Sequence, residues 1–230
     1  MNAPFRWIRP VSGPRVLSLG VLLLGALAQP AATQVAADPL AKVDEIFGAF
    51  DSDATPGCAV GMERAGERIV TEAYGMANLT WDIPFDEEMR SNIGSVTKQF
   101  TAMGLLLLEQ EGKLSLDDEV RTHIPELPDF GTPVTLRNLL NHVGGYRELY
   151  NAFGMLGYNG EDAFPREKVI ELVQRQPDLQ APPNTEFNYN NTGYILVAMT
   201  IERVSGMSFQ DYMEARVFEP LGMVDTGTAR

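Results

Sequence analysis

A long apolar run, "FTAMGLLLLEQ" at residues 100–110, is the feature that most constrains how this chain can fold. Its leucines at positions 105–108 spread hydrophobic surface around the whole circumference of a helix. One face carries apolar side chains at helical spacing, namely Val96, Phe100, Met103 and Leu107. A helix that is hydrophobic all round is buried, so we predict a central helix surrounded by other elements. Gly112 is its expected C-terminal stop.

Shorter patterns on either side predict the neighbouring elements. Residues 40–50 carry apolar side chains at helical spacing, and two β-like runs flank "RAGE" at residues 64–67, which predicts a helix followed by a hairpin. The polar, proline-containing stretch 79–89 is expected to be a loop. From residue 116 to about residue 217 the pattern alternates between helices and loops.

This order predicts an α+β fold that consists of a helix, a hairpin, a central helix and then a mostly helical region. Residues 38–112 are expected to form the N-terminal α/β part, and residues 113–230 the mostly helical lobe. A two-stranded hairpin is only marginally stable alone. We therefore expect further strands, and we expect these residues to be the C-terminally incomplete front part of a longer protein.

The first 37 residues differ from the rest. Three arginines without an acidic residue are followed by an apolar run at 16–28 and then by small residues up to 37. This order predicts a secretory signal peptide, cleaved after Ala28 or after Ala37. The alternative is a membrane anchor, but the apolar run is short for a bilayer crossing. We expect a secreted or periplasmic protein with no stable membrane insertion after cleavage.

The charge balance excludes some partners. The formal net charge is −13, and removing residues 1–37 takes away three arginines and no acid. So acidic a chain repels phosphate backbones, which argues against nucleic acid as a partner. Cys58 is the single cysteine, and the two histidines, His123 and His142, show no zinc-binding spacing. We therefore expect neither a metal nor a cofactor. The oligomeric state is not predicted.

Ser95 and Lys98 lie three residues apart where the apolar run begins. A serine hydroxyl is a poor nucleophile until a base removes its proton. On a helix, Lys98 would lie one turn beyond Ser95 on the same face, and burial would disfavour its charged form. The helix N-terminus would also offer N–H groups to a developing oxyanion. The structural alternative makes Ser95 an N-cap and Lys98 a solvated first-turn residue.

Tyr189, Asn190 and Asn191 form a second polar cluster, in "FNYNNTGYILVAMT", directly before another apolar helix. A tyrosine beside a lysine ammonium can shuttle protons, because the nearby charge lowers the pKa of its phenol. Asn191 could donate to a substrate carbonyl and accept from the lysine. The alternative is a turn with a helix-capping asparagine.

Three ordered stretches unite these clusters: "IGSVTKQFTAMGLLLLEQEGKLSLDDEV", "PVTLRNLLNHVGGY" and "FNYNNTGYILVAMTIERVSGMSFQDYMEARVFEPLGMVDT". Together they closely resemble the β-lactamase-related serine hydrolases, the group of class C β-lactamases, D-alanyl-D-alanine peptidases and esterases. The resemblance runs from about residue 40 to residue 225. It implies an α+β architecture in which an antiparallel sheet is flanked by helices and joined by a helical lobe. It also implies a cofactor-independent serine hydrolase that forms an acyl-enzyme on a β-lactam, a D-amino-acid peptide or a carboxylic ester.

The resemblance also implies roles for individual residues. Ser95 matches the acylated serine, Lys98 the lysine of Ser-x-x-Lys, and Tyr189 and Asn191 the Tyr-x-Asn pair. Lys98 and Tyr189 would share the proton transfers, with the acylation base left open between them. Asn191 would orient a small-molecule or peptide substrate.

The chain departs from the family pattern in three places. Where the family usually reads His-Thr-Ser-Gly, residues 142–145 are His-Val-Gly-Gly, and where it usually reads Pro-Gly, Pro183 is followed by Asn184. Asn tolerates the left-handed backbone, so the second change is mild. We expect His142 to be a structural hydrogen bonder; the alternative is a second base.

The third departure is the family's last motif, Lys- or His-Thr/Ser-Gly, which is missing. Residues 225–227, Asp-Thr-Gly, lack the cation and come too early in the family order. The motif's strand supplies an oxyanion donor, and losing one such donor typically costs about a hundredfold or more in rate. The rival hypothesis is therefore a non-catalytic binding or interaction protein, or an inactive fragment of such an enzyme.

Overall fold

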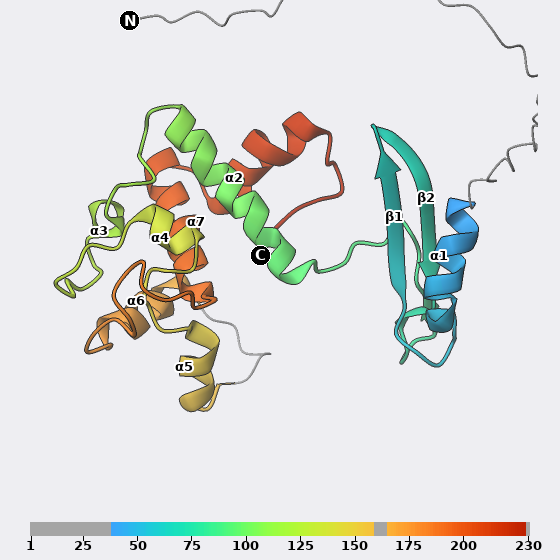
Figure 1. Cartoon of the computed structure of the whole chain (residues 1–230), viewed down its shortest axis with the longest axis horizontal. Helices are drawn as coiled ribbons and strands as arrows, with labels where there is room; N and C mark the ends of the chain where they lie inside the picture. The colour runs from blue at the N-terminus through green and yellow to red at the C-terminus, as the bar shows by residue number, and fades with distance from the viewer. Residues whose placement is uncertain (1–37, 159–164, 229–230) are drawn as a thin grey trace, which may run out of the picture. The chain divides into compact units, whose positions relative to one another are not determined.

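The computed structural model describes residues 38–158 and 165–228, so the predicted signal peptide lies outside the described residues. The chain divides into two compact units, the first ending at Glu87 and the second beginning at Glu88 (Figure 1). This division precedes the long central helix, whereas the sequence suggested a boundary at residue 112. The helix belongs to the second unit because its buried face packs against two later helices, α7 and α8.

The described part of the first unit begins with the predicted amphipathic helix, α1 (Pro39–Phe47), which a 3₁₀ turn, Gly48–Phe50, follows. Asp38 caps α1, because its carboxylate accepts from the backbone N–H of Leu40 at 3.1 Å. The helix packs on strand β2 (Glu67–Tyr74). Val43, Val70 and Tyr74 form the small core between them.

The predicted hairpin is confirmed. Strand β1 (Cys58–Arg64) pairs with β2 in antiparallel register, and Ala65 and Gly66 make the turn with φ values of 54° and 81°. Two positive φ values match the right-handed twist of the flanking strands. A second antiparallel pair joins β3 (Met76–Asn78) to β4 (Ile83–Pro84). Part of the predicted loop 79–89 is thus a strand. The described residues mix helix and strand, as the α+β prediction requires.

The second unit is helical, with loops between its elements. Its helices are α2 (Thr97–Gln110), α3 (Val120–His123), α4 (Leu136–Leu140), α5 (Leu149–Met155), α6 (Arg166–Gln174), α7 (Asn191–Ser205) and α8 (Phe209–Met213). A π-helical turn, Glu214–Phe218, and a 3₁₀ turn, Glu219–Leu221, follow α8. Gly112 and Gly206 follow α2 and α7 with φ values of 69° and 71°, the left-handed conformation of a helix stop.

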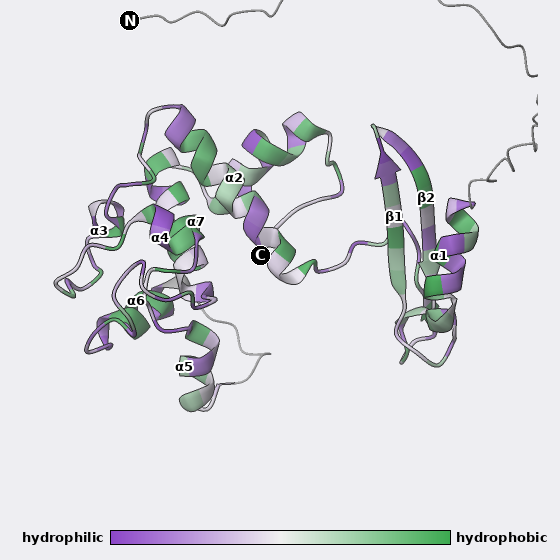
Figure 2. Ribbon diagram, viewed as in Figure 1, coloured by the Kyte–Doolittle hydropathy of each residue, from purple (hydrophilic) through white to green (hydrophobic). Residues whose placement is uncertain are grey.

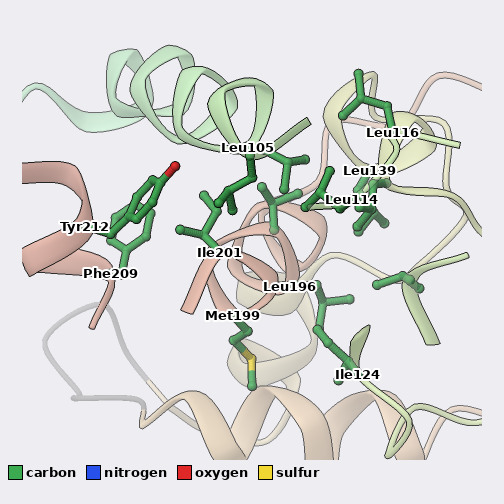
Figure 3. Packing of buried hydrophobic residues seen from close by; sticks show 14 of the residues in the cluster. Leu105, Leu114, Leu116, Ile124, Leu139, Leu196, Met199, Ile201, Phe209 and Tyr212 are labelled. Atoms are coloured by element: carbon green, nitrogen blue, oxygen red, sulfur yellow. The ribbon is translucent and has the colours of Figure 1, made fainter. Parts of the chain in front are cut away.

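The core of the second unit lies where α2 meets α7 and α8 (Figure 3). Leu105, Leu196 and Ile201 are fully buried there. Figure 2 shows hydrophobic residues along α2, but the expected burial on all sides is wrong for the described residues. Met103 and Leu106 are 47% and 41% exposed. α7 and α8 cover the face of Leu105, and the described residues leave these two side chains partly uncovered.

Gly104 sets how closely α2 approaches its neighbours. A Cβ at this position would lie 3.0 Å from the sulfur of Met213 and 3.3 Å from Cδ1 of Ile201. The buried hydroxyl of Tyr212 donates to the carbonyl oxygen of Gly104 at 3.1 Å. The missing side chain therefore fixes the spacing between α2, which follows Ser95, and α7, which follows Tyr189.

Candidate active site

Ser95 lies in a 3₁₀ turn, Gly94–Val96, that leads directly into α2. The side chain of Asn92 accepts from the N–H of Gly94 at 2.8 Å, and Gly94 has a φ of 53°. This tight entry leaves the Ser95 side chain exposed. The N-cap residue of α2 is Val96, so Ser95 is not a capping serine and its hydroxyl is free for other contacts.

Lys98 contacts both clusters picked out from the sequence. Its Nζ donates to Ser95 Oγ at 3.1 Å and to Asn191 Oδ1 at 2.7 Å. The ammonium also lies 4.7 Å from the centroid of the Tyr189 ring. Lys98 is half-buried, not buried as the sequence argument supposed. It is nevertheless tied to the site and is not a free first-turn residue.

Tyr189 reaches Ser95 from the loop that precedes α7. Its hydroxyl lies 2.5 Å from Ser95 Oγ, although the two residues are 94 positions apart. The hydrogen bond from Lys98 lowers the pKa of the Tyr189 phenol below its ordinary value, and the hydrogen bond with Ser95 lowers it further. The structure thus brings the four predicted residues together: Ser95, Lys98, Tyr189 and Asn191.

His142 and Asn190 hold the tyrosine loop in place. Asn190 caps α7, because its Oδ1 accepts from the N–H of Gly193 at 2.7 Å. Its own backbone N–H donates to Nδ1 of His142 at 3.0 Å. The imidazole lies against the Tyr189 ring, with centroids 4.5 Å apart. Burial lowers the pKa of His142, as does nearby Lys98. His142 is therefore a structural hydrogen bonder, as expected.

Glu148 is a site residue that the sequence analysis missed. Its Oε1 accepts from Asn191 Nδ2 at 2.7 Å, and its Oε2 accepts from the backbone N–H of Asn151 at 3.0 Å. The second bond caps α5. Acidic residues are enriched at the start of helices, but that signal reveals only the local bond. The bond to Asn191 depends on how α5 packs beside α7.

The two altered family loops are hydrogen-bonded to each other, because the backbone N–H of Asn184 donates to the carbonyl oxygen of Val143 at 2.9 Å. Asn184 has a φ of 65°, the left-handed conformation expected for it, and accepts from Nδ2 of Asn138 at 2.8 Å. Gly145 has a φ of 78°, and a Cβ there would overlap the carbonyl oxygen of Ala181. A Cβ on Gly144 would lie 3.1 Å from Cγ1 of Val134. Both glycines therefore occupy positions where a side chain is not readily accommodated.

A pocket of about 230 Å³ opens beside Lys98 and Asn191. Its other walls come from α2, α5, α7 and α8, and its apolar part includes Ile195, Ala198 and Phe209. In residues 38–158 and 165–228, no group of three or more His, Cys, Asp or Glu side chains is arranged to hold a metal ion. Over the same ranges, no helix has the length and hydrophobicity that a bilayer crossing requires.

Comparison with known proteins places this arrangement in a family. Penicillin-binding protein 4* of Bacillus subtilis is 32% identical over 162 residues, which cover 70% of this chain and 35% of that protein. A D-aminopeptidase of Cereibacter sphaeroides is 30% identical over 168 residues, which cover 73% of this chain and 32% of the enzyme. The chain thus spans about a third of the length of these curated relatives.

A solved structure and a family model agree with these relatives. The octameric penicillin-binding protein homologue from Pyrococcus abyssi superposes with a TM-score of 0.68 at 33% identity, over 80% of this chain and 43% of that one. The family model described as Beta-lactamase matches residues 41–230. This chain therefore belongs to the beta-lactamase family of serine hydrolases and penicillin-binding proteins.

Proposed function

We propose that this chain carries the nucleophile of a serine hydrolase that acts through an acyl-enzyme on an amide or ester carbonyl. The observation that carries the proposal is the position of Ser95. Its exposed hydroxyl is hydrogen-bonded to two proton-transferring groups at once, Tyr189 at 2.5 Å and Lys98 at 3.1 Å. A nucleophile within hydrogen-bond reach of a base that is itself oriented is the usual arrangement of covalent catalysis.

In the proposed reaction, Ser95 Oγ attacks the substrate carbonyl carbon while its proton passes to the phenolate oxygen of Tyr189. A C–O bond forms, and the resulting tetrahedral oxyanion collapses. The C–N or C–O bond to the leaving group then breaks, and that group takes the proton back from Tyr189. Water hydrolyses the acyl-serine by the same proton transfers in reverse. The N-terminal end of α2 favours the negative charge that develops.

Tyr189 is the acylation base in this proposal, and the hydrogen bond from Lys98 favours its anionic form by lowering the pKa of the phenol. The phenol is closer to Ser95 than the ammonium is, and its pKa is lowered by the ammonium beside it. Asn191 Oδ1 accepts from the same ammonium and so fixes its position. A deprotonated Tyr189 would accept from the Ser95 hydroxyl across the same 2.5 Å.

As the substrate class we propose an amide of a D-amino acid or a D-amino-acid peptide. The names of the relatives, penicillin-binding protein and D-aminopeptidase, support this choice for the whole protein. The pocket beside Lys98 adds support, because its apolar wall of Ile195, Ala198 and Phe209 offers space for a nonpolar side chain. A β-lactam, a cyclic amide, would meet the same nucleophile.

The test is intact-mass spectrometry after incubation with a penicillin and, separately, with a fluorophosphonate. Wild type is compared with Ser95→Ala and with Ser91→Ala, a matched control four residues earlier in the same segment. We expect one adduct on wild type and Ser91→Ala and none on Ser95→Ala. Wild-type protein that is folded by circular dichroism but takes up neither reagent would contradict the proposal and favour a non-catalytic binding protein.

We also propose that the protein is exported. The support is the order of basic, apolar and small residues at 1–37. N-terminal sequencing of protein from cell fractions tests this: a start at residue 29 or 38 in the secreted or periplasmic fraction is expected. Uncleaved protein in the cytoplasm would contradict it.

A further inference from the structure

Glu148 takes no part in the acylation steps, yet both of its carboxylate oxygens are engaged beside the site. Oε1 accepts from Asn191 Nδ2 at 2.7 Å, and Oε2 accepts from the N–H of Asn151 at 3.0 Å. The side chain is half-buried and is held at the first turn of α5. A carboxylate bound at both oxygens presents a fixed acceptor to Asn191.

The fixed acceptor matters because the side-chain amide of Asn191 can be placed in two orientations. Its oxygen and its NH₂ group have nearly the same shape, so either could be turned towards Lys98. An ammonium only donates hydrogen bonds, and therefore only the oxygen can bond to Lys98. A carboxylate only accepts, and therefore it draws the NH₂ group to the opposite side. The structure shows this order: Lys98 donates to Asn191 Oδ1 at 2.7 Å, and Asn191 Nδ2 donates to Glu148 at 2.7 Å.

We propose that Glu148 is a positioning residue that orients the amide of Asn191, so that its oxygen holds the Lys98 ammonium beside Ser95 and Tyr189. The expected effect on acylation rests on the proposed function. The orienting role itself rests only on the hydrogen-bond chain from Glu148 through Asn191 to Lys98.

Other bonds already join the two segments that carry Glu148 and Asn191. Asn190 Nδ2 donates to the carbonyl oxygen of Tyr146 at 2.7 Å, and Thr192 Oγ1 donates to that of Arg147 at 2.7 Å. These neighbours anchor the segments without the Glu148 side chain. Replacing Glu148 should therefore change the direction of the amide and leave the segments joined.

The experiment is a double-mutant cycle between Glu148→Gln and Asn191→Asp. In Glu148→Gln the side chain has only one oxygen, and that oxygen caps α5 by accepting from the N–H of Asn151. The NH₂ group of the glutamine then faces the NH₂ group of Asn191, so that two donors meet. Asn191→Asp alone places two carboxylates in hydrogen-bond contact. The double variant restores the donor–acceptor order of the hydrogen-bond chain, because the new carboxylate at position 191 accepts both from the new glutamine amide and from the Lys98 ammonium. The net charge of the pair is unchanged.

The measured quantity is the rate constant of fluorophosphonate labelling at Ser95. We expect each single variant to label between about tenfold and about a hundredfold more slowly, the range for losing one hydrogen bond to a charged group. The double variant should label faster than either single variant. Glu148→Ser, which keeps a helix-capping residue but cannot reach Asn191, should be as slow as Glu148→Gln.

The urea unfolding midpoint is a second readout, which does not require activity. It is measured on wild type, the two single variants and the double variant. Non-additive midpoints, with the double variant more stable than the two single effects predict, support the pairing. The positioning role would be overturned if Glu148→Gln labelled at the wild-type rate. It would also be overturned if the double variant labelled more slowly than both single variants. If even wild type does not label, the proposed function fails, and additive urea midpoints would then overturn the pairing as well.

Discussion

Replacing Tyr189 by phenylalanine is the sharpest test of the proposed proton transfer. The change removes the hydroxyl 2.5 Å from Ser95 Oγ and keeps the ring that lies against His142. A positioned general base contributes about 10²- to 10⁴-fold to a rate, which corresponds to about 2.7 to 5.4 kcal/mol of activation free energy. We expect the labelling rate constant of Tyr189→Phe to fall by this factor while its urea midpoint stays close to that of wild type.

The pH profile should change with the rate. Lys98 and Ser95 lower the pKa of the Tyr189 phenol, so wild-type labelling should rise with pH through a value below that of a free phenol. Tyr189→Phe should lose this rise. The assay is fluorophosphonate labelling followed by mass spectrometry across a pH series.

Tyr194→Phe is the matched control for this experiment. The Tyr194 ring also lies near Lys98, at 5.5 Å, but its hydroxyl donates to the carbonyl oxygen of Leu140 at 3.0 Å and not to Ser95. Losing that bond should cost about 1 kcal/mol of unfolding free energy and leave the labelling rate within about threefold. Equal losses of rate in the two variants, or a wild-type rate in Tyr189→Phe, would refute Tyr189 as the base.

Three further predictions concern stability, each measured by urea unfolding. Leu105→Ala, at a fully buried position, should cost about 2 to 5 kcal/mol, whereas Leu106→Ala, 41% exposed, should cost less than about 1 kcal/mol; equal costs would show that α2 is covered on both faces. Gly145→Ala should cost more than Gly131→Ala, because both have a positive φ (78° and 77°) but only the first overlaps Ala181; a reversed order would contradict the clash. Arg203 holds the pKa of Glu126 at about 2, so this ion pair should stabilise the folded state fully at pH values above the ordinary glutamate pKa. That stabilisation should be lost as the pH falls towards 2. Glu126→Gln should flatten that acid loss, and an unchanged pH dependence would contradict the pairing.

The sequence predicted the elements whose signals are local. The turn at Ala65 and Gly66 followed from the break between two β-like runs, and the left-handed Asn184 followed from what asparagine tolerates. The proximity of Ser95 to Lys98 follows from helix geometry, because residues three apart share a face. Each of these features depends on residues close together in the chain.

Features that depend on packing could not be predicted in this way. The contact between Tyr189 and Ser95 joins residues 94 positions apart and requires the α2–α7 spacing set at Gly104; only the family resemblance suggested it. Glu148 was missed for the same reason, since its capping signal says nothing about Asn191. The exposure of Leu106 was wrongly predicted because hydrophobicity around a helix does not reveal which faces find partners.

The tight surroundings of Gly144 restrict how this chain could regain the family's usual motif. The serine of His-Thr-Ser-Gly corresponds to Gly144, and a Cβ there would lie 3.1 Å from Val134 and 3.2 Å from Leu139. A single Gly144→Ser replacement would therefore press on two buried side chains before its hydroxyl made any contact. Trimming Val134 or Leu139 first would open that space but leave a cavity. Whether a side chain fits at position 144 is therefore decided by how far Val134 and Leu139 can shift.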